Sequence, residues 1–460
     1  MTEMRAAAVA LLAALALVTG CGGADVGAGP DSSAGLLKPG ALVYWQTVSD
    51  PDSPQWEQAG DLLDKFPDGE RWIAELKKEI EAEGVSWEAD VKPALGSVVD
   101  VAVYAGPGGD PLAFVGLTNP DDKDKLLELV RKLNAKSDEP MVSRVVGDWV
   151  AISTNQEAID VALKEEGGQA LADDDMFKSA MEELPDDALS RVYVDPARAI
   201  ALVGEGPARE ALDMLGLDSL DFAGAWAKAK EDGAELAVTL RGEGAGRLLG
   251  SGEPYVSKLL DKVPEDAFAF VTFQGEGFAG QLEQLRGTPW LAMVLRELER
   301  EAGIDLTELA TLLDGEVAFF VRRGAPTAEF TLLLDSDDPA GAKRSIEPLL
   351  RLVPDTFRLT VETLENVVVV STALDPLADL RGDDAKLADS DRFKDALDAA
   401  GAPEQYTGLA YVDLDEASAL IASLADSEAL RRNLEPLGSL VAYGSEDGSL
   451  STFLAFLEID

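Results

Sequence analysis

The block Leu171-Ala172-Asp173-Asp174-Asp175-Met176-Phe177-Lys178 returns 216 residues later as Leu387-Ala388-Asp389-Ser390-Asp391-Arg392-Phe393-Lys394. Two further matches, Tyr193-Val194-Asp195 with Tyr411-Val412-Asp413 and Ser153-Thr154 with Ser371-Thr372, both lie 218 residues apart. Solenoid repeats are only about 20–50 residues long. The spacing therefore predicts a duplicated domain rather than a repeat array.

The two copies are expected at residues 36–242 and 257–460, in a chain of 460 residues. Residues 243–256 begin with the glycine-rich run EGAGRLLGSGE and are predicted to be a linker. The offset between the copies is 225 residues at Thr47 and 218 at Trp72, which places seven additional residues in the first copy. The segment SDPDSPQW at 49–56 is the natural place for them.

Each copy shows the same order of predicted elements: a strand, a helix, a hairpin, a helix and a second hairpin, followed by further helices around the Tyr-Val-Asp strand. In the first copy the strand, hairpins and intervening helix are expected at 42–48, 98–104 with 112–118, 121–133, and 142–146 with 149–153. In the second copy they are expected at 267–273, 317–321 with 330–334, 340–352, and 357–363 with 367–371. Hairpins that alternate with single helices predict an α+β fold: two tandem homologous domains with largely antiparallel sheets.

The composition excludes several classes of function. The formal net charge of −47 repels nucleic acid, so we expect no nucleic-acid partner. A hydrophobic content of 46% supports folded cores rather than disorder. This acid excess is compatible either with salt adaptation or with cations held near the surface, and composition does not separate the two.

The chain contains no histidine and a single cysteine, Cys21. These absences exclude Ser-His-Asp and Cys-His catalysis and almost every zinc site. The sequence also lacks a phosphate-binding P-loop, a dinucleotide fingerprint and a GxSxG elbow. We therefore predict a protein that is not an enzyme, with no catalytic residue, no metal site and no cofactor.

The N-terminus resembles that of bacterial lipoproteins. Leu17-Val18-Thr19-Gly20-Cys21 follows an apolar stretch at 6–18, which is too short to span a bilayer but fits a signal peptide. This resemblance implies a signal peptide at 1–20, acylation of Cys21 by diacylglycerol and palmitate, and anchoring at the extracytoplasmic face of the cell membrane. Residues 21–35, rich in glycine, alanine and serine, are predicted to be a flexible tether to the bilayer.

Several acidic residues are predicted to cap helices. Asp173-Asp174-Asp175 precedes a helical pattern, and Thr154-x-x-Glu157 matches a capping box. Asp195 and Asp413 each end a strand where a helix begins, so capping explains them as well. As an alternative, Asp195 and Asp413 are candidate ligand-binding residues, because two carboxylates that face one cleft could act as acid and base.

The tryptophans are unevenly distributed between the copies. Trp72 and Trp290 occupy matching positions and are expected in the core. Trp56 adjoins the additional segment of the first copy, and an amphipathic aromatic residue on a loop often contacts a partner. It is therefore a candidate ligand- or partner-binding residue, although it could also cover its own helix.

The order of motifs resembles an uncharacterised bacterial family of envelope proteins, found in actinobacteria and related high-GC lineages. The residues that carry this resemblance are Pro39-Gly40-Ala41-Leu42-Val43-Tyr44, the block at 171–178, Tyr193-Val194-Asp195 and their second copies. The resemblance implies an extracytoplasmic setting and supplies no catalytic residues. We expect a lipid-anchored envelope protein that binds an unknown envelope ligand or protein, most plausibly between its two domains. The alternatives are a carboxylate-based hydrolase of envelope glycans and a calcium-responsive spacer or adhesin.

Overall fold

The computed structural model describes residues 32–460 except for short gaps, which are 83, 107–111, 205, 207–208, 210–211, 213–215, 249–252, 276–279, 281, 284–285, 288, 303–304, 325–327, 351–352, 354–357, 382–384 and 419–426. By its contacts the chain forms two compact units. Unit 1 comprises the chain up to Glu243 with Ile459 and Asp460, and unit 2 comprises Gly244–Glu458.

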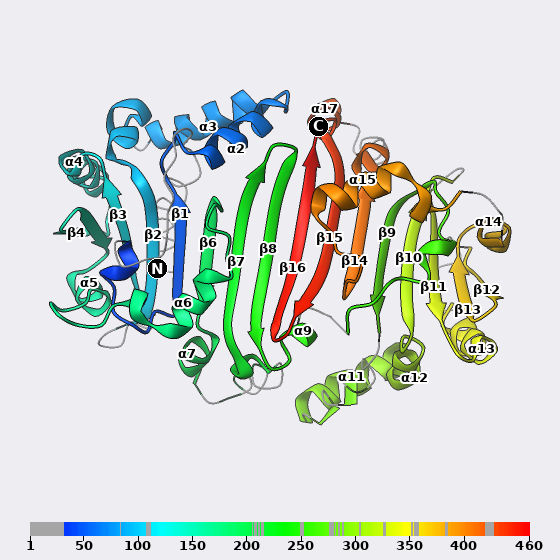
Figure 1. Ribbon diagram of the computed structural model, residues 1–460. Helices are drawn as coiled ribbons and strands as arrows, with labels where there is room; N and C mark the ends of the chain where they lie inside the picture. Colours follow the sequence, from blue (N-terminus) through cyan, green and yellow to red (C-terminus); the bar gives the residue numbers. More distant parts are fainter. Residues whose placement is uncertain are drawn as a thin grey trace. The chain divides into compact units, whose positions relative to one another are not determined.

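The centre of unit 1 is an antiparallel sheet with the strand order β8-β7-β6-β1-β2-β3-β5-β4 (Figure 1). Its strands are β1 Val43–Val48, β2 Gly96–Ala105, β3 Leu112–Pro120, β4 Val142–Val146, β5 Trp149–Ser153, β6 Ser190–Val194, β7 Leu220–Lys230 and β8 Gly233–Gly242. Alternating β-branched and aromatic residues favour these strands. Strand β6 lies between β1 and β7, so the sheet is not a simple succession of hairpins.

Helices pack against this sheet. The helices of unit 1 are α2 Pro54–Asp64, α3 Gly69–Ala82, α4 Lys123–Asn134, α5 Gln156–Ala162, α6 Asp175–Glu182 and α7 Pro196–Ala201. Helix α6 packs against β6 and β7, and helix α5 packs against β2 and β3. A separate apolar cluster joins α3 and α4 to β5 and contains Ile80, Leu126, Leu129 and Ile152.

Unit 2 contains an antiparallel sheet with the strand order β16-β15-β14-β9-β10-β11-β13-β12. Its strands are β9 Ala267–Gln274, β10 Glu316–Arg322, β11 Glu329–Asp335, β12 Thr360–Leu364, β13 Val367–Ser371, β14 Gly408–Asp413, β15 Leu437–Asp447 and β16 Leu450–Ile459. Its helices are α9 Ala245–Leu248, α11 Pro289–Ala302, α12 Leu306–Thr311, α13 Pro339–Leu349, α14 Pro376–Arg381, α15 Asp391–Ala400 and α17 Glu428–Leu434. The prediction of an α+β fold with a largely antiparallel sheet is therefore confirmed.

Equivalent positions of the two units follow from their strand registers. Gln46 pairs with Asp100 and Arg191 in unit 1, and Thr272 pairs with Ala318 and Leu409 in unit 2. Thr272 therefore corresponds to Gln46, so the match of Thr272 with Thr47 expected from the sequence is wrong by one residue. The second hairpins also match, because Gly147 at φ 60° occupies the position that Glu365 takes at φ 54°. Glu365 is the single non-glycine residue with positive φ in the described parts of the chain.

The repeated phenylalanine forms the same contact in both units. Phe177 of α6 is fully buried and lies edge-on between the rings of Tyr44 and Tyr193, with centroids 5.1 and 5.3 Å away. Phe393 of α15 is buried edge-on against Tyr411, at a centroid distance of 4.9 Å. Edge-to-face pairs of this kind add to the free energy of burial. The conserved block of the repeat therefore joins a helix to the sheet.

Three predictions made for side chains in this part of the fold require correction or confirmation. Trp72 was expected in the core but is 38% exposed, because it packs on Phe66 in the turn before α3 rather than on the sheet. The capping residue of α5 is Asn155, whose side chain accepts from Ala158 N, so the capping box at Thr154 is wrong by one residue. Asp174 caps α6 as predicted and accepts from Met176 N and Phe177 N.

Candidate ligand-binding site

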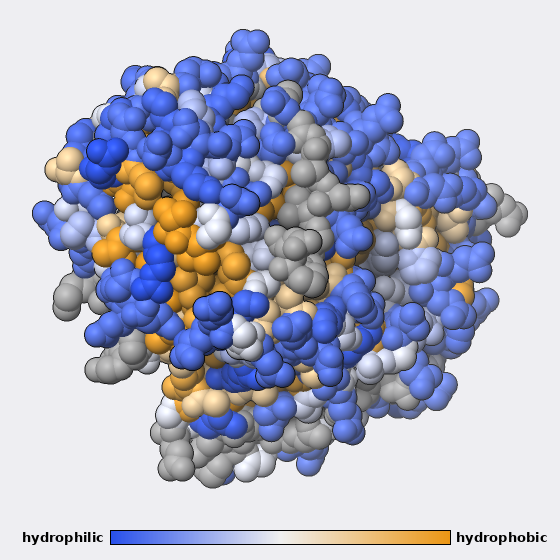
Figure 2. Space-filling view, turned by 60° about the vertical axis from the view of Figure 1, so that its left-hand side comes forward, coloured by the Kyte–Doolittle hydropathy of each residue, from blue (hydrophilic) through white to orange (hydrophobic). Residues whose placement is uncertain are grey.

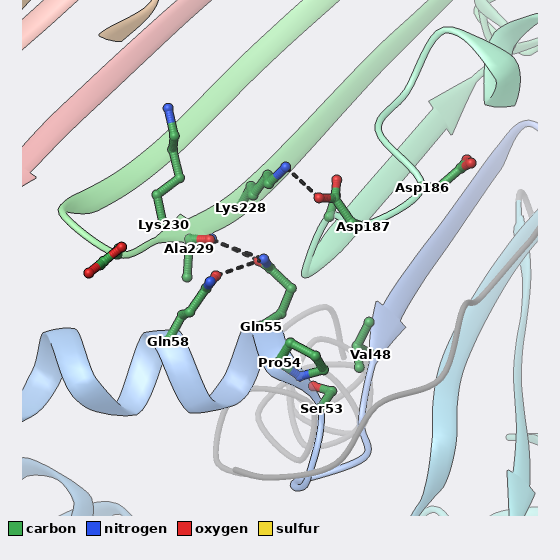
Figure 3. Close-up of a pocket in the computed structure, with 12 residues that line it drawn as sticks. Val48, Ser53, Pro54, Gln55, Gln58, Asp186, Asp187, Lys228, Ala229 and Lys230 are labelled. Carbon is green, nitrogen blue, oxygen red and sulfur yellow. Dashed lines mark hydrogen bonds and ion pairs between the residues drawn. The ribbon is translucent and has the colours of Figure 1, made fainter. Parts of the chain in front are cut away.

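A pocket of about 480 Å³ opens at one end of strands β1, β6 and β7 (Figure 3). Its walls come from Val48 at the end of β1, from the start of α2, from the loop before β6 and from the β7–β8 hairpin. The polar side chains of the lining include Ser53, Gln55, Gln58, Asp186, Asp187, Lys228, Lys230 and Glu231. The pocket therefore combines both signs of charge with an apolar floor.

Gln55 ties helix α2 to the sheet. Its Nε2 donates to the carbonyl oxygen of Ala229 at 3.0 Å, and its Oε1 accepts from the backbone N–H of Ala229 at 2.8 Å. The side-chain amide thus occupies the place that a neighbouring strand would take beside β7. Ser53 caps α2 by accepting from Trp56 N, and Pro54 occupies the first turn, which positions Gln55.

We expect Gln55→Ala to lower the free energy of unfolding by about 2 kcal/mol, because the substitution leaves the buried N–H and C=O of Ala229 without partners. Gln58→Ala is the matched control, since it removes only the 3.2 Å bond between the two glutamine side chains. That control should stay within about 0.5 kcal/mol of the wild type in urea unfolding. Equal effects of the two substitutions would contradict this role of Gln55.

Four charged side chains of the pocket form ion pairs. Lys228 Nζ lies 2.6 Å from Asp187 Oδ2, and Lys230 Nζ lies 2.7 Å from Glu235 Oε1. Asp186 Oδ1 lies 3.4 Å from Arg191 Nη1, and this arginine extends from the pocket wall into the interior. The pocket is thereby linked to a group of buried polar side chains beneath it.

We call this group the buried polar cluster; it consists of Ser33, Tyr44, Gln46, Asp100 and Arg191. Arg191 Nη2 donates to Gln46 Oε1, Gln46 Nε2 donates to Tyr44 Oη at 3.4 Å, and the hydroxyl groups of Tyr44 and Ser33 lie 3.0 Å apart. The cluster lies on the face of the sheet that packs against α6, since Tyr44 contacts Phe177.

Asp100 is the member of the cluster with the fewest hydrogen bonds. It is 0% exposed, and among the described residues no donor meets hydrogen-bond geometry with either of its carboxylate oxygens. Burial raises the pKa of Asp100 to about 7, although the nearby side chains of Ser33, Tyr44 and Gln46 and the charge of Arg191 act to lower it. Burial in turn lowers the pKa of Arg191 and raises that of Tyr44.

Unit 2 has a different buried acid. The positions of Asp100 and Arg191 are occupied there by Ala318 and Leu409, as the registers show. Glu316, two residues before Ala318, is buried and accepts hydrogen bonds from Thr272 Oγ1 at 3.1 Å, from Ser257 Oγ and from backbone N–H groups of the chain entering the unit. The pocket-linked cluster is therefore a property of unit 1.

The opposite face of the unit 1 sheet is apolar. Val192 and Val194 of β6 are half-buried, whereas Arg191 and Tyr193, which alternate with them, are buried on the α6 side. The same alternation occurs in β1 and β8, where Trp45 and Val238 point to the side away from α6. We call this side of strands β8, β7, β6, β1, β2 and β3 the open face. Helix α4 covers its edge at β3, where Gly116 and Thr118 lie against Leu126 and Leu129.

The predicted site residues are engaged in local structure. Trp56 is half-buried on α2, and its indole Nε1 donates to the carbonyl oxygen of Val48 at 2.7 Å. Asp195 caps α7 by accepting from Arg198 N at 2.9 Å, and its other oxygen lies 3.0 Å from Arg198 Nε. Neither residue lines the pocket described above.

Asp413 has the corresponding role in unit 2. It accepts from Glu416 N at 3.0 Å and lies 2.9 Å from Arg392 Nε. Partial burial raises the pKa of Asp413 in spite of these contacts. Cys21 lies outside the described residues.

Sequence reasoning missed the pocket and the buried polar cluster. The additional segment at 49–56 did mark the right region, since Ser53, Pro54 and Gln55 line the pocket. The polar residues Gln46, Asp100 and Arg191 within otherwise apolar strands were a further signal, because buried polar groups in strands need specific partners.

Comparison with known proteins yields no relative: no family model, no curated protein and no solved structure matches the chain. In the described portion of the chain, no helix is both long and apolar enough to span a bilayer. The same portion holds no group of three or more acidic, histidine or cysteine side chains suited to a metal ion.

Proposed function

We propose that this chain is a lipid-anchored protein of the extracytoplasmic membrane face, which binds a ligand without transforming it. The observation that carries the proposal is the open face of unit 1, together with the pocket at the end of its strands. An apolar surface bordered by a few placed polar groups is typical of ligand sites. In this proposal Cys21 supplies the anchor and unit 1 supplies the binding site.

We further propose that the units are tandem homologous domains that arose by duplication. The supporting observations are the identical strand orders, the Phe177 and Phe393 contacts, and the matching hairpin positions. Duplication leaves one copy free to diverge. The buried polar cluster of unit 1, absent from the equivalent positions of unit 2, indicates that the first copy carries the specialised site.

A non-catalytic role is supported by the chemistry of the pocket. Asp186 and Asp187 face Arg191 and Lys228, so neither is an isolated carboxyl group poised to exchange a proton. The chain has no histidine to act as an alternative base. In this proposal the charged side chains of the pocket bind the ligand and join the loop before β6 to the β7–β8 hairpin.

Anchoring is tested by Cys21→Ser. The wild-type protein should incorporate radiolabelled palmitate and float with membranes, and the variant should lose both properties because serine offers no thiol for acylation. Gly20→Ala is the matched control, since it keeps a small residue before the cysteine and should keep the label. Label that persists on the Cys21→Ser protein would contradict the anchor.

Ligand binding is tested by native mass spectrometry of the anchored protein extracted from its own membrane. The proposal expects a non-covalent mass in addition to the acyl chains on Cys21. A bare protein, reproducibly obtained under conditions that preserve other lipoprotein complexes, would contradict ligand binding and favour a scaffold.

A further inference from the structure

The open face of unit 1 contains two unbroken apolar rows that cross six strands. In the first row, neighbouring strands place side by side Leu240, Ala223, Val194, Val43, Val103 and Phe114. In the second row they place Val238, Ala225, Val192, Trp45, Val101 and Gly116. We call these two rows the apolar strip. With strands about 4.8 Å apart, the apolar strip is about 24 Å wide.

The apolar strip is accessible in part, since Leu240, Val101, Val103 and Gly116 are buried and the other members are half-buried or exposed. Val238 and Phe114, near its two ends, are each 38% exposed, and Trp45 near its middle is half-buried. Figure 2, in which unit 1 comes forward, shows an apolar area framed by hydrophilic side chains. An accessible apolar area of this kind on a chain with a net charge of −47 indicates a binding surface.

The apolar strip has no polar group to offer an occupant. Its side chains carry a single polar atom, the indole Nε1 of Trp45, which donates to Ser190 Oγ at 2.6 Å. A peptide laid across this surface would leave its own backbone groups without partners, which is costly. A hydrocarbon chain has no such groups. The high negative charge also opposes the approach of a second copy of this chain.

The next row of the sheet is more polar. It consists of Leu236, Ala227, Ser190, Thr47, Val99 and Thr118, and three of these six side chains carry hydroxyl groups. The hydroxyl groups of Thr47 and Ser190 lie 3.2 Å apart, and we call this row the hydroxyl row. The charged pocket lies at this same end, next to Val48 and Ala229. Polarity therefore rises along the strands, from the apolar strip to hydroxyl groups and then to ion pairs.

The proposed anchor keeps unit 1 close to lipid. The chain enters unit 1 at Ser33, which is buried beside Tyr44. Eleven residues from Cys21 to Ser32 span at most about 40 Å when fully extended. The acyl chains of one leaflet reach about 15 Å, half of the hydrocarbon thickness, which is less than the width of the apolar strip.

We infer that the apolar strip binds an acyl chain of a membrane lipid, with the lipid headgroup directed toward the hydroxyl row and the pocket. This inference rests on the proposed function, because it names the ligand class of the proposed site. The occupant enters from the bilayer to which Cys21 holds the protein.

The test uses the full anchored protein in phosphatidylcholine vesicles with brominated or unbrominated acyl chains. Bromine quenches tryptophan emission only on close contact. The brominated lipid should quench the wild-type protein, and Trp45→Phe should remove most of this quenching. Trp72→Phe is the matched control: Trp72 is exposed on α3 and is not a member of the apolar strip, so its loss should leave the quenching that depends on Trp45 in place.

A second variant keeps all tryptophans. Val238→Asp places a charge in the apolar strip at a 38% exposed position and should reduce the quenching of Trp45 several-fold. Met176→Asp is its control, because Met176 is 39% exposed in the first turn of α6, where an acid is well tolerated.

Flotation of the same samples separates the two proposals. Protein that fails to float contradicts the anchor and hence the proposed function. Protein that floats but shows quenching independent of Trp45 and Val238 overturns the acyl-chain inference alone. Unquenched protein that sediments as a dimer also overturns it, since that result assigns the apolar strip to a second copy.

Discussion

Phe177→Ala and Phe393→Ala should each lower the free energy of unfolding by about 3–5 kcal/mol. Each substitution removes a buried aromatic ring from the contact between a helix and the sheet, and it leaves a cavity that a close-packed core fills only in part. Phe177 loses two edge-to-face partners, Tyr44 and Tyr193, whereas Phe393 loses Tyr411. The larger cost is therefore expected at Phe177.

The measurement is urea unfolding followed by both circular dichroism and tryptophan fluorescence. Six of the seven tryptophans lie in unit 1, so fluorescence reports mainly on that unit. Met176→Ala and Lys394→Ala, each next to its phenylalanine in sequence, serve as controls because these side chains are exposed. Each control should cost less than half as much as its neighbouring phenylalanine. A phenylalanine that costs no more than its control would contradict the equivalence of the two contacts.

The local elements of this fold could be predicted because their physical determinants are local. The hairpin of β4 and β5 follows from alternating side chains that flank Gly147, which takes a positive φ of 60°. The helix of the repeated block follows from the spacing of Phe177, Ala180 and Met181, all buried on one side. In unit 2 the hairpin of β12 and β13 and helix α15 show the same pattern of side chains.

The arrangement of the strands could not be predicted in this way. Strand β6 pairs with β1, and the pair joins Gln46 to Arg191 across 145 residues of sequence. No local pattern encodes such a neighbour. The open face was missed for a related reason: Val192 and Val194 look like core residues, and only the layers of the fold show which part of an apolar sheet face is left without a helix.

The errors at Trp72 and Thr154 have a common origin. The Trp72 prediction rests on one residue that matches between the two halves of the sequence, and the Thr154 prediction rests on one residue that matches a motif. In the structure a nearby residue fills each expected role instead. Helix α3 buries Ile80, so Trp72 two turns earlier lies beyond the edge of that contact. Asn155 is as good a cap as Thr154, and its position relative to Ala158 N determines which of the two is used.

Asp100→Asn should flatten the pH dependence of stability between about pH 4 and pH 7. The pKa of Asp100 is raised from 3.8 to about 7 in the folded protein. Below pH 4 the carboxyl group is protonated in both states and contributes nothing. As the pH rises toward 7 the unfolded chain releases this proton while the folded protein retains it, so stability falls. Above pH 7 both states are ionised and the loss is constant, on the order of 4 kcal/mol.

The measurement is the free energy of unfolding at intervals from pH 4 to pH 8 for the wild type and for Asp100→Asn. The many other carboxyl groups contribute to both curves, so the difference between the curves isolates Asp100. Asp50→Asn is the control: partial burial and Asp52 raise the pKa of Asp50 to about 6, which lies in the same range, but Asp50 is outside the buried polar cluster. The control should retain most of the slope that Asp100→Asn removes.

The sheet itself does not require the loss of folding free energy that buried Asp100 causes at neutral pH. Unit 2 has a sheet of the same strand order with alanine and leucine at the positions of Asp100 and Arg191. Buried charged groups of opposite sign often stabilise a fold less than apolar residues of similar volume. We therefore expect the double variant Asp100→Ala, Arg191→Leu to be at least as stable as the wild type at pH 7. The single variant Arg191→Leu should be less stable, since it leaves Asp100 buried without its positive neighbour. The opposite result, a double variant that unfolds more readily than either single variant, would show that the buried polar cluster stabilises the sheet. The contact of Arg191 with Asp186 at the pocket would then not be needed to explain why the cluster is present.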